Sequence, residues 1–208
     1  IAIPTGHYQV EVALRTPVQD APAEARASIG PVALEPGPWR QRFRSSAIPA
    51  PRTPLVDRAS EVAELLELLT DDGGPRLVTL TGAAGSGKTR LAIEAGLRWQ
   101  EKLPGGVVFV RLGSVTDAHT FELALLSALG VRTLDNTPPG EALCRYLHGV
   151  VPAPQLILDN FEQLAKSAPL VGSLLDASAS LKVLVTSRVA LHLYGECEYP
   201  VIPLAIPA

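Results

Sequence analysis

The chain has 208 residues, of which 47% are hydrophobic and 19% are charged, and its formal net charge is −3. This balance excludes a disordered chain, and the small negative charge gives no nucleic-acid footprint. No apolar run approaches the roughly 18 residues that a membrane-spanning helix needs, so we expect a cytoplasmic protein without membrane contact. There is no methionine, and we expect the sequence to be a fragment of a longer polypeptide.

The first 54 residues differ in composition from the rest of the chain. Residues 8–14 alternate apolar and polar side chains and predict a short strand, and we expect residues 1–15 to be the tail of a preceding domain. Prolines recur through residues 16–54, which favours an extended linker because proline fixes φ and has no N–H. A short basic patch at residues 39–44 is interpreted as a solvated segment rather than a nucleic-acid site.

From residue 55 onward, segments with helical periodicity alternate with short apolar runs. We predict helices from about residue 57 to the glycines at 73–74 and at about 88–102, 117–129, 139–148 and 169–179. We predict strands at 77–81, 107–112, 156–159, 182–186 and 198–202, the last at a sheet edge because it contains a proline. This order indicates an α/β fold with a parallel sheet and helices on both faces, in which ligands bind beyond the carboxyl ends of the strands.

The most informative stretch joins the first predicted strand to the following helix and contains the pattern G-x-x-x-x-G-K-T. This is the arrangement of a phosphate-binding loop, or P-loop, in which glycines let backbone N–H groups turn toward phosphate oxygens at a helix N-terminus. A glycine loop that only turns a strand into a helix needs neither the lysine nor the threonine. The predicted nucleotide-binding residues are Gly82, Ala83, Ala84, Gly85, Ser86, Gly87, Lys88, Thr89 and Arg90.

The P-loop predicts the roles of two side chains and the position of a third. Lys88 is expected to reach the β- and γ-phosphates, and the Thr89 hydroxyl is expected to bind Mg²⁺. Asp159 ends an apolar strand, as the second Mg²⁺-binding residue of such sites does, because Mg²⁺ prefers hard oxygen ligands. The alternative is an aspartate that only caps the turn after its strand.

Asn160 follows Asp159, where many ATPases have an acid. An amide can orient a water molecule but cannot accept its proton, so we expect slow hydrolysis or hydrolysis assisted from elsewhere. Glu162 is near in sequence but needs a turn to bring it back toward the site. The expected catalytic residues are Lys88, Asp159, Asn160 and Arg188.

Thr186, Ser187 and Arg188 follow the fourth predicted strand. Arg188 is expected to contact the γ-phosphate, which would let the site distinguish ATP from ADP. The alternative is a surface arginine in a loop. Thr186 either hydrogen-bonds the attacking water or caps the end of its strand.

Several motifs occur in order and together resemble one family. They are Leu55-Val56-Asp57-Arg58, the P-loop, the LDNFEQL run at 158–164, the VTSR run at 185–188 and the run at 195–201. Residues 55–208 thus resemble the nucleotide-binding domain of STAND/NB-ARC signalling ATPases, and most closely that of bacterial transcriptional regulators of the LuxR type and the antibiotic-regulator type.

The resemblance implies a switch that holds ADP when silent and ATP with Mg²⁺ when active, and that self-associates in the ATP state. It also implies that Arg58 contacts adenine and ribose, although Asp57 stands where the family usually has glycine. The family's later Gly-x-Pro contact with adenine is absent, so we expect the domain to be truncated at its C-terminal end. Other domains of the same polypeptide would make any contact with DNA.

Two alternatives remain open from the sequence. A small-molecule kinase or another P-loop ATPase enzyme would need a substrate pocket and often an arginine-rich lid, and the arginines here are scattered. A scaffold that binds nucleotide without turnover fits the amide of Asn160. The N-K-x-D motif of GTPases and the L-S-G-G-Q motif of transporter ATPases are both absent, and the cysteines and histidines form no metal-binding pattern.

Overall fold

The computed structural model describes residues 48–132 and 137–204. Within these residues a five-stranded parallel sheet has the order β2-β3-β4-β1-β5. The strands are β1 (Leu77–Thr81), β2 (Val107–Arg111), β3 (Gln155–Asp159), β4 (Val183–Thr186) and β5 (Glu196–Pro200). The helices are α2 (Ala59–Thr70), α3 (Lys88–Gln100), α4 (Ala118–Leu129), α5 (Pro139–Gly149), the 3₁₀ helix η2 (Phe161–Ser167) and α6 (Ala168–Ala177). The predicted α/β fold is confirmed.

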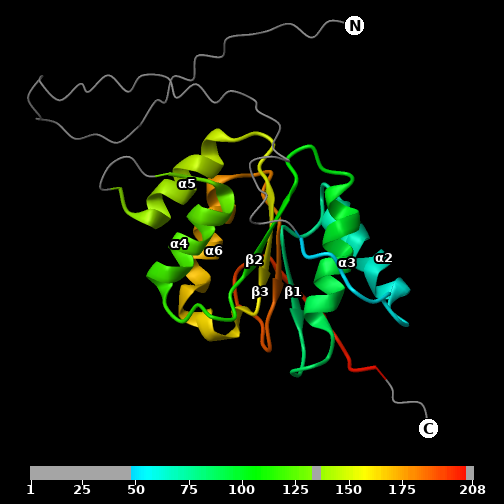
Figure 1. Ribbon diagram of the computed structural model, residues 1–208. Coiled ribbons are helices and arrows are strands. Elements are labelled where there is room, and N and C mark those ends of the chain that lie inside the picture. The colour runs from blue at the N-terminus through cyan, green and yellow to red at the C-terminus, as the bar shows by residue number, and fades with distance from the viewer. Residues whose placement is uncertain (1–47, 133–136, 205–208) are drawn as a thin grey trace, which may run out of the picture. The chain divides into compact units, whose positions relative to one another are not determined.

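Helices cover both faces of the sheet, with α2 and α3 on one face and α4, α5 and α6 on the other (Figure 1). Successive side chains of a strand point to opposite faces, so each strand contributes to two cores. In β3, Leu156 and Leu158 pack with α4–α6, whereas Ile157 packs with α2 and α3. Burial on both faces explains why β1 to β4 are nearly continuous apolar runs in the sequence.

The position of β4 determines the geometry of the site. This strand lies between β1 and β3, with Leu80 opposite Thr186 and Leu158 opposite Val185. Because all strands are parallel, the residues after β1, β3 and β4 emerge at the same edge of the sheet. The end of β4 therefore stands between the P-loop and Asp159.

Several boundaries differ by one to a few residues from those predicted, among them those of α2 and β5. Helix α2 ends at Thr70, before the glycine pair, because the Asp71 carboxylate accepts a hydrogen bond from the Gly73 N–H and the Asp71 carbonyl accepts one from the Gly74 N–H. Strand β5 begins two residues earlier than predicted and lies at the sheet edge, as its proline indicated. Its inward side chains, Cys197 and Tyr199, pack against the α2 and α3 face.

The first described residues lie on this domain. The Ile48 side chain is 7% exposed and packs beside Gly96 of α3, where a Cβ atom would be 3.1 Å from it. Ile48 falls within the range predicted to be a linker. The predicted strand at 8–14, the basic patch at 39–44 and most of that linker lie outside the described residues. Among the described residues, no helix is both long enough and apolar enough to cross a membrane.

Candidate functional site

The P-loop connects β1 to α3, and Gly82, Gly85 and Gly87 in it all have a positive φ, which favours glycine. Gly82 has a φ of 143°, and a Cβ atom there would lie 2.6 Å from the Val201 carbonyl oxygen. Gly87 has a φ of 96° and is the N-cap of α3. The N–H groups in the first turn of a helix have no acceptor within the helix, so this loop presents backbone donors and a positive dipole end together.

Lys88, the first residue of α3, bends back over the loop. Its Nζ donates hydrogen bonds to the carbonyl oxygens of Gly82, at 2.7 Å, and Ala83, at 2.8 Å. Desolvation lowers the pKa of this ammonium from its usual value, the Arg188 charge lowers it further, and the carboxylates of Glu162 and Asp159 oppose that shift. The Lys88 charge thus lies within the field of all three groups.

Asp159 is held by hydroxyl groups from two other elements. Its Oδ1 accepts hydrogen bonds from Thr89 Oγ1 and from Thr186 Oγ1, each at 2.7 Å. Thr186 Oγ1 also accepts a hydrogen bond from the Asn160 backbone N–H at 2.9 Å. The Asp159 and Thr186 residues are 8% and 1% exposed, so this network is shielded from solvent. Thr186 binds the aspartate directly, which sequence reasoning did not anticipate.

The neighbouring oxygens of Thr89 and Asp159 suit a hard cation. Mg²⁺ is usually held by one or two protein oxygens, substrate phosphates and water rather than by a complete protein cage. Nowhere in residues 48–132 and 137–204 do three or more His, Cys, Asp or Glu side chains cluster as a metal site. The hydroxyl and carboxylate beside the P-loop therefore fit a cation that arrives with a phosphate ligand.

Asn160 turns the chain back toward the P-loop. It adopts the left-handed conformation, with φ 69° and ψ 51°, and η2 begins at the next residue. This turn returns Glu162 to the site, where its Oε1 accepts a hydrogen bond from Arg188 Nε at 3.3 Å. The sequence left open whether such a turn exists, and η2 provides it.

A pocket of about 440 Å³ lies over this end of the P-loop. It brings together residues from three separate segments of the sequence: the P-loop with the start of α3, the residues after β3 and the residues after β4. Its lining includes Ala84, Gly85, Gly87, Lys88, Thr89, Arg90, Asn160, Glu162 and Arg188. Every predicted catalytic residue therefore either lines this pocket or, in the case of Asp159, bonds Thr89 at its wall.

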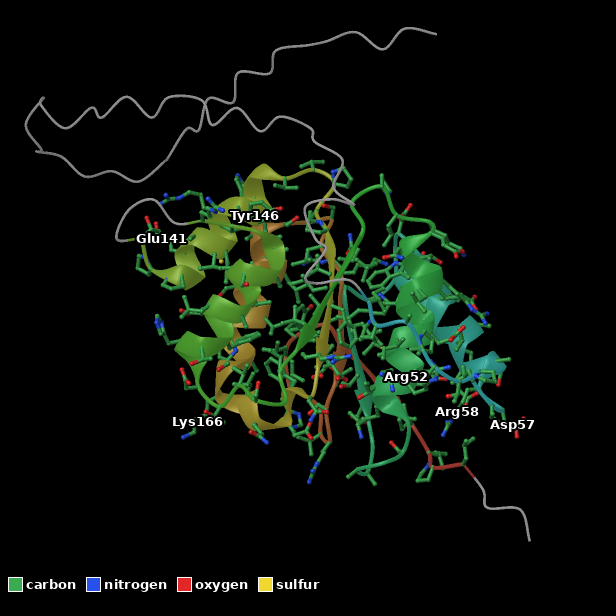
Figure 2. The ribbon with its side chains drawn as sticks, viewed as in Figure 1. Arg52, Asp57, Arg58, Glu141, Tyr146 and Lys166 are labelled. Carbon is green, nitrogen blue, oxygen red and sulfur yellow. The ribbon has the colours of Figure 1, made fainter. Side chains whose placement is uncertain are left out.

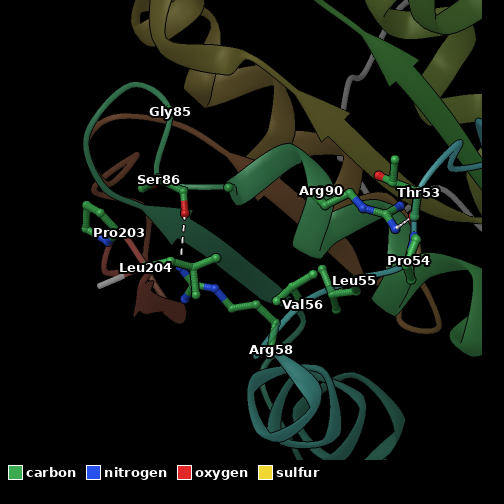
Figure 3. Close-up of a pocket in the computed structure, with 11 residues that line it drawn as sticks. Thr53, Pro54, Leu55, Val56, Arg58, Gly85, Ser86, Arg90, Pro203 and Leu204 are labelled. Carbon is green, nitrogen blue, oxygen red and sulfur yellow. Dashed lines mark hydrogen bonds between the residues drawn. The ribbon is translucent and has the colours of Figure 1, made fainter. Parts of the chain in front are cut away.

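A second pocket of about 390 Å³ lies on the other side of the P-loop (Figure 3). It shares Gly85, Gly87 and Arg90 with the first pocket. Apart from Ser86 of the loop, its remaining lining comes from the two ends of the described domain and is mostly apolar: Thr53, Pro54, Leu55, Val56, Arg58, Pro203 and Leu204. An apolar pocket that adjoins a phosphate-binding loop suits the flat face of a nucleotide base.

Arg58 lines this second pocket, but its guanidinium binds protein groups. It donates hydrogen bonds to the carbonyl oxygens of Ser86, at 3.2 Å (Figure 3), and of Ile202. Its Nη1 atom also pairs with Glu61 at 2.7 Å. The residue is only 7% exposed. Arg58 thereby ties the P-loop to α2 and to the segment after β5. Sequence reasoning placed Arg58 at this site without finding these bonds.

Arg90 stands between the two pockets. Its guanidinium donates to the Thr53 carbonyl oxygen (Figure 3), and it lies 3.9 Å from the Glu94 carboxylate. The Nη1 atom of Arg90 is buried and has no hydrogen-bond partner among the described residues. This arginine therefore anchors the segment before α2 to the first turn of α3.

A family model described as an AAA domain matches residues 71–196. The chain belongs to the AAA domain family. The matched range contains the whole P-loop, Asp159, Glu162 and Arg188, whereas Arg58 precedes it. Over this range the chain is thus an AAA domain with a P-loop.

Two mycobacterial relatives are similar to this AAA domain. An uncharacterized protein of Mycobacterium tuberculosis and Mycobacterium bovis is 35% identical over 157 residues, which are 74% of this chain and 38% of that protein. A protein of the same species, named as a proposed HTH-type transcriptional regulator, is 33% identical over 132 residues, or 63% of this chain and 14% of that protein. The chain therefore spans little more than a third of the length of the first relative.

Two solved structures share the fold. The ORC1 protein of Aeropyrum pernix, solved in complex with DNA, has a TM-score of 0.59 at 22% identity, covering 80% of this chain and 50% of that chain. A Signal Transduction ATPase with Numerous Domains (STAND) from Pyrococcus horikoshii, with a tetratricopeptide repeat sensor, has a TM-score of 0.51 at 20% identity, covering 73% and 24%. The resemblance to STAND ATPases noted in the sequence is thus matched by a likeness in fold.

Proposed function

We propose that this AAA-type P-loop ATPase domain is an ATP/ADP-binding switch in a longer signalling protein. The observation that carries the proposal is the network in which the Thr89 hydroxyl and the Asp159 carboxylate meet beside the P-loop, 2.7 Å apart. The AAA family generally binds nucleotide together with Mg²⁺. A hydroxyl and a carboxylate placed beside phosphate-binding backbone donors are what such a ligand requires.

Each predicted residue then has a role in binding. The loop residues Gly82 to Ser86 and the start of α3 would bind the phosphates through backbone N–H groups, and Lys88 would neutralise the β- and γ-phosphates. Thr89 and Asp159 would hold Mg²⁺, which on binding would supply charge stabilisation to the phosphates. The apolar pocket beside Arg58 would receive the adenine.

Slow hydrolysis is part of the proposal. Asn160 can orient a water molecule but cannot accept its proton, and its left-handed backbone directs the chain into η2. Arg188 lines the pocket beside Lys88 and is positioned to meet a γ-phosphate. An ATPase that senses the γ-phosphate but turns it over slowly functions as a timer or switch rather than as a metabolic enzyme.

The output is proposed to be transcription. This rests on the relative named as a proposed HTH-type transcriptional regulator and on the motifs shared with bacterial regulators. DNA contact would come from other domains of the same polypeptide, and self-association would accompany the ATP state. Neither activity is attributed to the residues described above.

The test is nucleotide binding by the full chain and by two lysine variants. Lys88→Ala should weaken ATP and ADP binding by about tenfold or more, because one charge-assisted contact to phosphate is lost. Lys102→Ala, an exposed lysine just after α3, is the matched control and should leave both affinities unchanged. Equal binding by the Lys88→Ala variant and the unsubstituted chain would exclude the P-loop as the nucleotide site.

A further inference from the structure

The pocket over the P-loop contains an ion pair that the proposed role of Arg188 does not use. Arg188 Nε donates to Glu162 Oε1 at 3.3 Å, and both side chains line the pocket together with Lys88 and Thr89. The arginine that would recognise a γ-phosphate is thus already paired with a carboxylate. Any γ-phosphate entering this pocket has to compete with that carboxylate for the same guanidinium.

We propose that Glu162 is a specificity-determining residue that makes this site favour ADP over ATP. It would act in two ways, by holding Arg188 and by placing a negative charge where the γ-phosphate has to lie. The inference rests on the proposed nucleotide binding at the P-loop. It assigns to Glu162 a role that Asn160, as a neutral amide, cannot perform.

The backbone on both sides of the pair is anchored, so the two side chains are held near each other. Phe161 and Leu164 flank Glu162 in η2, and both are buried, at 1% and 2% exposure. The Phe161 ring makes an edge-to-face contact with Phe121 of α4, with centroids 5.5 Å apart. On the other side, the Ser187 N–H donates to the Leu80 carbonyl oxygen at 3.0 Å, which holds the residue before Arg188 against β1.

The exposures of the two partners differ, and this difference favours a role in discrimination. The Glu162 side chain is 19% exposed and the Arg188 side chain is 61% exposed. The carboxylate is therefore fixed at the pocket wall with limited screening, whereas the guanidinium can move at little cost because exposed ion pairs contribute little. A phosphate can accept two parallel hydrogen bonds from the planar guanidinium, so it can compete with the Glu162 carboxylate for Arg188.

The charges around the pocket are consistent with this role. The Glu162 carboxylate favours the charged form of Lys88, whereas Arg188 disfavours it, so all three groups lie within one electrostatic field. ADP bound by the loop and Lys88 would leave the Glu162–Arg188 pair intact. ATP would bring additional negative charge toward Glu162 and would gain Arg188 only by separating the pair.

The experiment compares ATP and ADP affinities of the full chain with Mg²⁺ present. Glu162→Gln keeps the shape of the side chain and removes its charge, and it should raise the affinity for ATP relative to ADP by about threefold or more. Glu141→Gln is the control, because Glu141 also forms an ion pair, with Arg145 at 2.7 Å, but lies on α5. Figure 2 shows Glu141 on the opposite flank of the sheet from Arg58, which bonds the P-loop residue Ser86, so Glu141 lies away from the nucleotide site.

A second pair of variants tests whether Arg188 carries the effect. Arg188→Gln should lower the affinity for ATP relative to ADP, and Glu162→Gln should change that ratio less in the Arg188→Gln background than alone. An unchanged ratio in Glu162→Gln would overturn the inference, and equal effects in both backgrounds would overturn the part in which Glu162 acts by holding Arg188. If the unsubstituted chain binds neither nucleotide, the proposed function fails as well, whereas normal binding with an unchanged ratio rejects the role of Glu162 alone.

Discussion

Thr89 and Asp159 are 70 residues apart in the chain, yet their side chains share a 2.7 Å hydrogen bond beside the P-loop. One lies in the first turn of α3 and the other at the end of β3. A single hydroxyl–carboxylate contact therefore joins the two segments that bind phosphate and cation in the proposed site. In the proposed site the same two oxygens bind the cation.

Replacing Asp159 with asparagine should separate binding of the cation from binding of the nucleotide. The amide keeps the size of the side chain but removes the negative charge that Mg²⁺ requires. We expect Mg²⁺ to strengthen ATP binding by the unsubstituted chain and to have at least about tenfold less effect on the Asp159→Asn variant, or about 1.4 kcal/mol. Calorimetric titration with ATP, once in the presence of Mg²⁺ and once in the presence of a chelator, measures this effect of Mg²⁺ for each protein. Asp176→Asn, at an exposed position of α6, is the control, and loss of the Mg²⁺ effect in both variants would contradict the assignment.

Thr186→Val should lower stability and weaken the cation site together. Valine has nearly the same shape, so the change removes the hydrogen bond to Asp159 and leaves the Asn160 N–H without its hydroxyl acceptor. The loss of these two hydrogen bonds, of which the bond to the Asp159 carboxylate is buried, should cost about 1–3 kcal/mol, which urea denaturation can measure. Thr186→Ser should restore most of the loss, because it returns the hydroxyl.

The control for this change is Thr70→Val. Thr70 also donates through its hydroxyl, to the Leu66 carbonyl oxygen, but at an exposed position of α2. We expect the free energy of unfolding of this variant to change by no more than an ordinary surface substitution causes, about 0.5 kcal/mol. A Thr186→Val variant as stable as Thr70→Val would show that the Asp159 network contributes little to folding.

Arg58→Lys should destabilise the domain and weaken nucleotide binding at the same time. The planar guanidinium reaches Ser86, Ile202 and Glu61 together, which a single ammonium cannot reproduce. Hydrogen bonds to a charged group contribute about 1.5–3 kcal/mol each, so we expect a loss of that order in thermal or chemical denaturation. Arg98→Lys on α3, where the arginine is 50% exposed and pairs with Glu94, is the matched control.

The stability of the domain should fall in alkaline solution partly through Tyr199. Desolvation, together with the 2.7 Å hydrogen bond that its hydroxyl donates to Glu64, raises the pKa of Tyr199 well above its usual range. The unfolded chain loses this proton near pH 10 while the folded chain keeps it, so the contribution is present below pH 10 and is lost as the pH rises further. Tyr199→Phe removes this titration.

The measurement is the free energy of unfolding at pH 8 and at pH 11. Between pH 8 and pH 11 the free energy of unfolding of the unsubstituted chain should fall more than that of the Tyr199→Phe variant. Tyr194→Phe, at a fully exposed position, serves as the control for removing a tyrosine. A difference that stays constant across this range would mean that the Tyr199 hydroxyl has the same proton affinity folded and unfolded.

The sequence predicted the parts of this site but not how they are connected. The P-loop was predictable because its glycines, lysine and threonine lie within eight consecutive residues, and β1 to β4 were predictable because both of their faces are buried. The insertion of β4 between β1 and β3 depends on pairing between distant segments, which local periodicity does not record. Consequently the contact between Thr186 and Asp159 could not be foreseen.

Two other features depended on local chemistry that the pattern left ambiguous. The sequence indicates Asn160 only as a replacement for an acid. In the structure its left-handed backbone conformation, which asparagine tolerates better than most residues, returns Glu162 to the pocket. Arg58 was placed at the nucleotide by resemblance, whereas its bonds to backbone carbonyls require the folded positions of the P-loop and of the segment after β5. The resemblance to STAND ATPases predicts that Arg58 lies near the nucleotide, but it does not predict these contacts.

The central claim is that the domain holds nucleotide and hydrolyses ATP slowly, as a switch does. The most direct test is to identify the nucleotide released on denaturing the purified full chain and then to follow phosphate release from ATP with Mg²⁺. We predict bound ADP and release on the order of one phosphate per minute or slower, far below the roughly 10 per second of a typical enzyme. Release at the rate of a typical enzyme, or a chain that neither retains nor binds adenine nucleotide, would contradict the account.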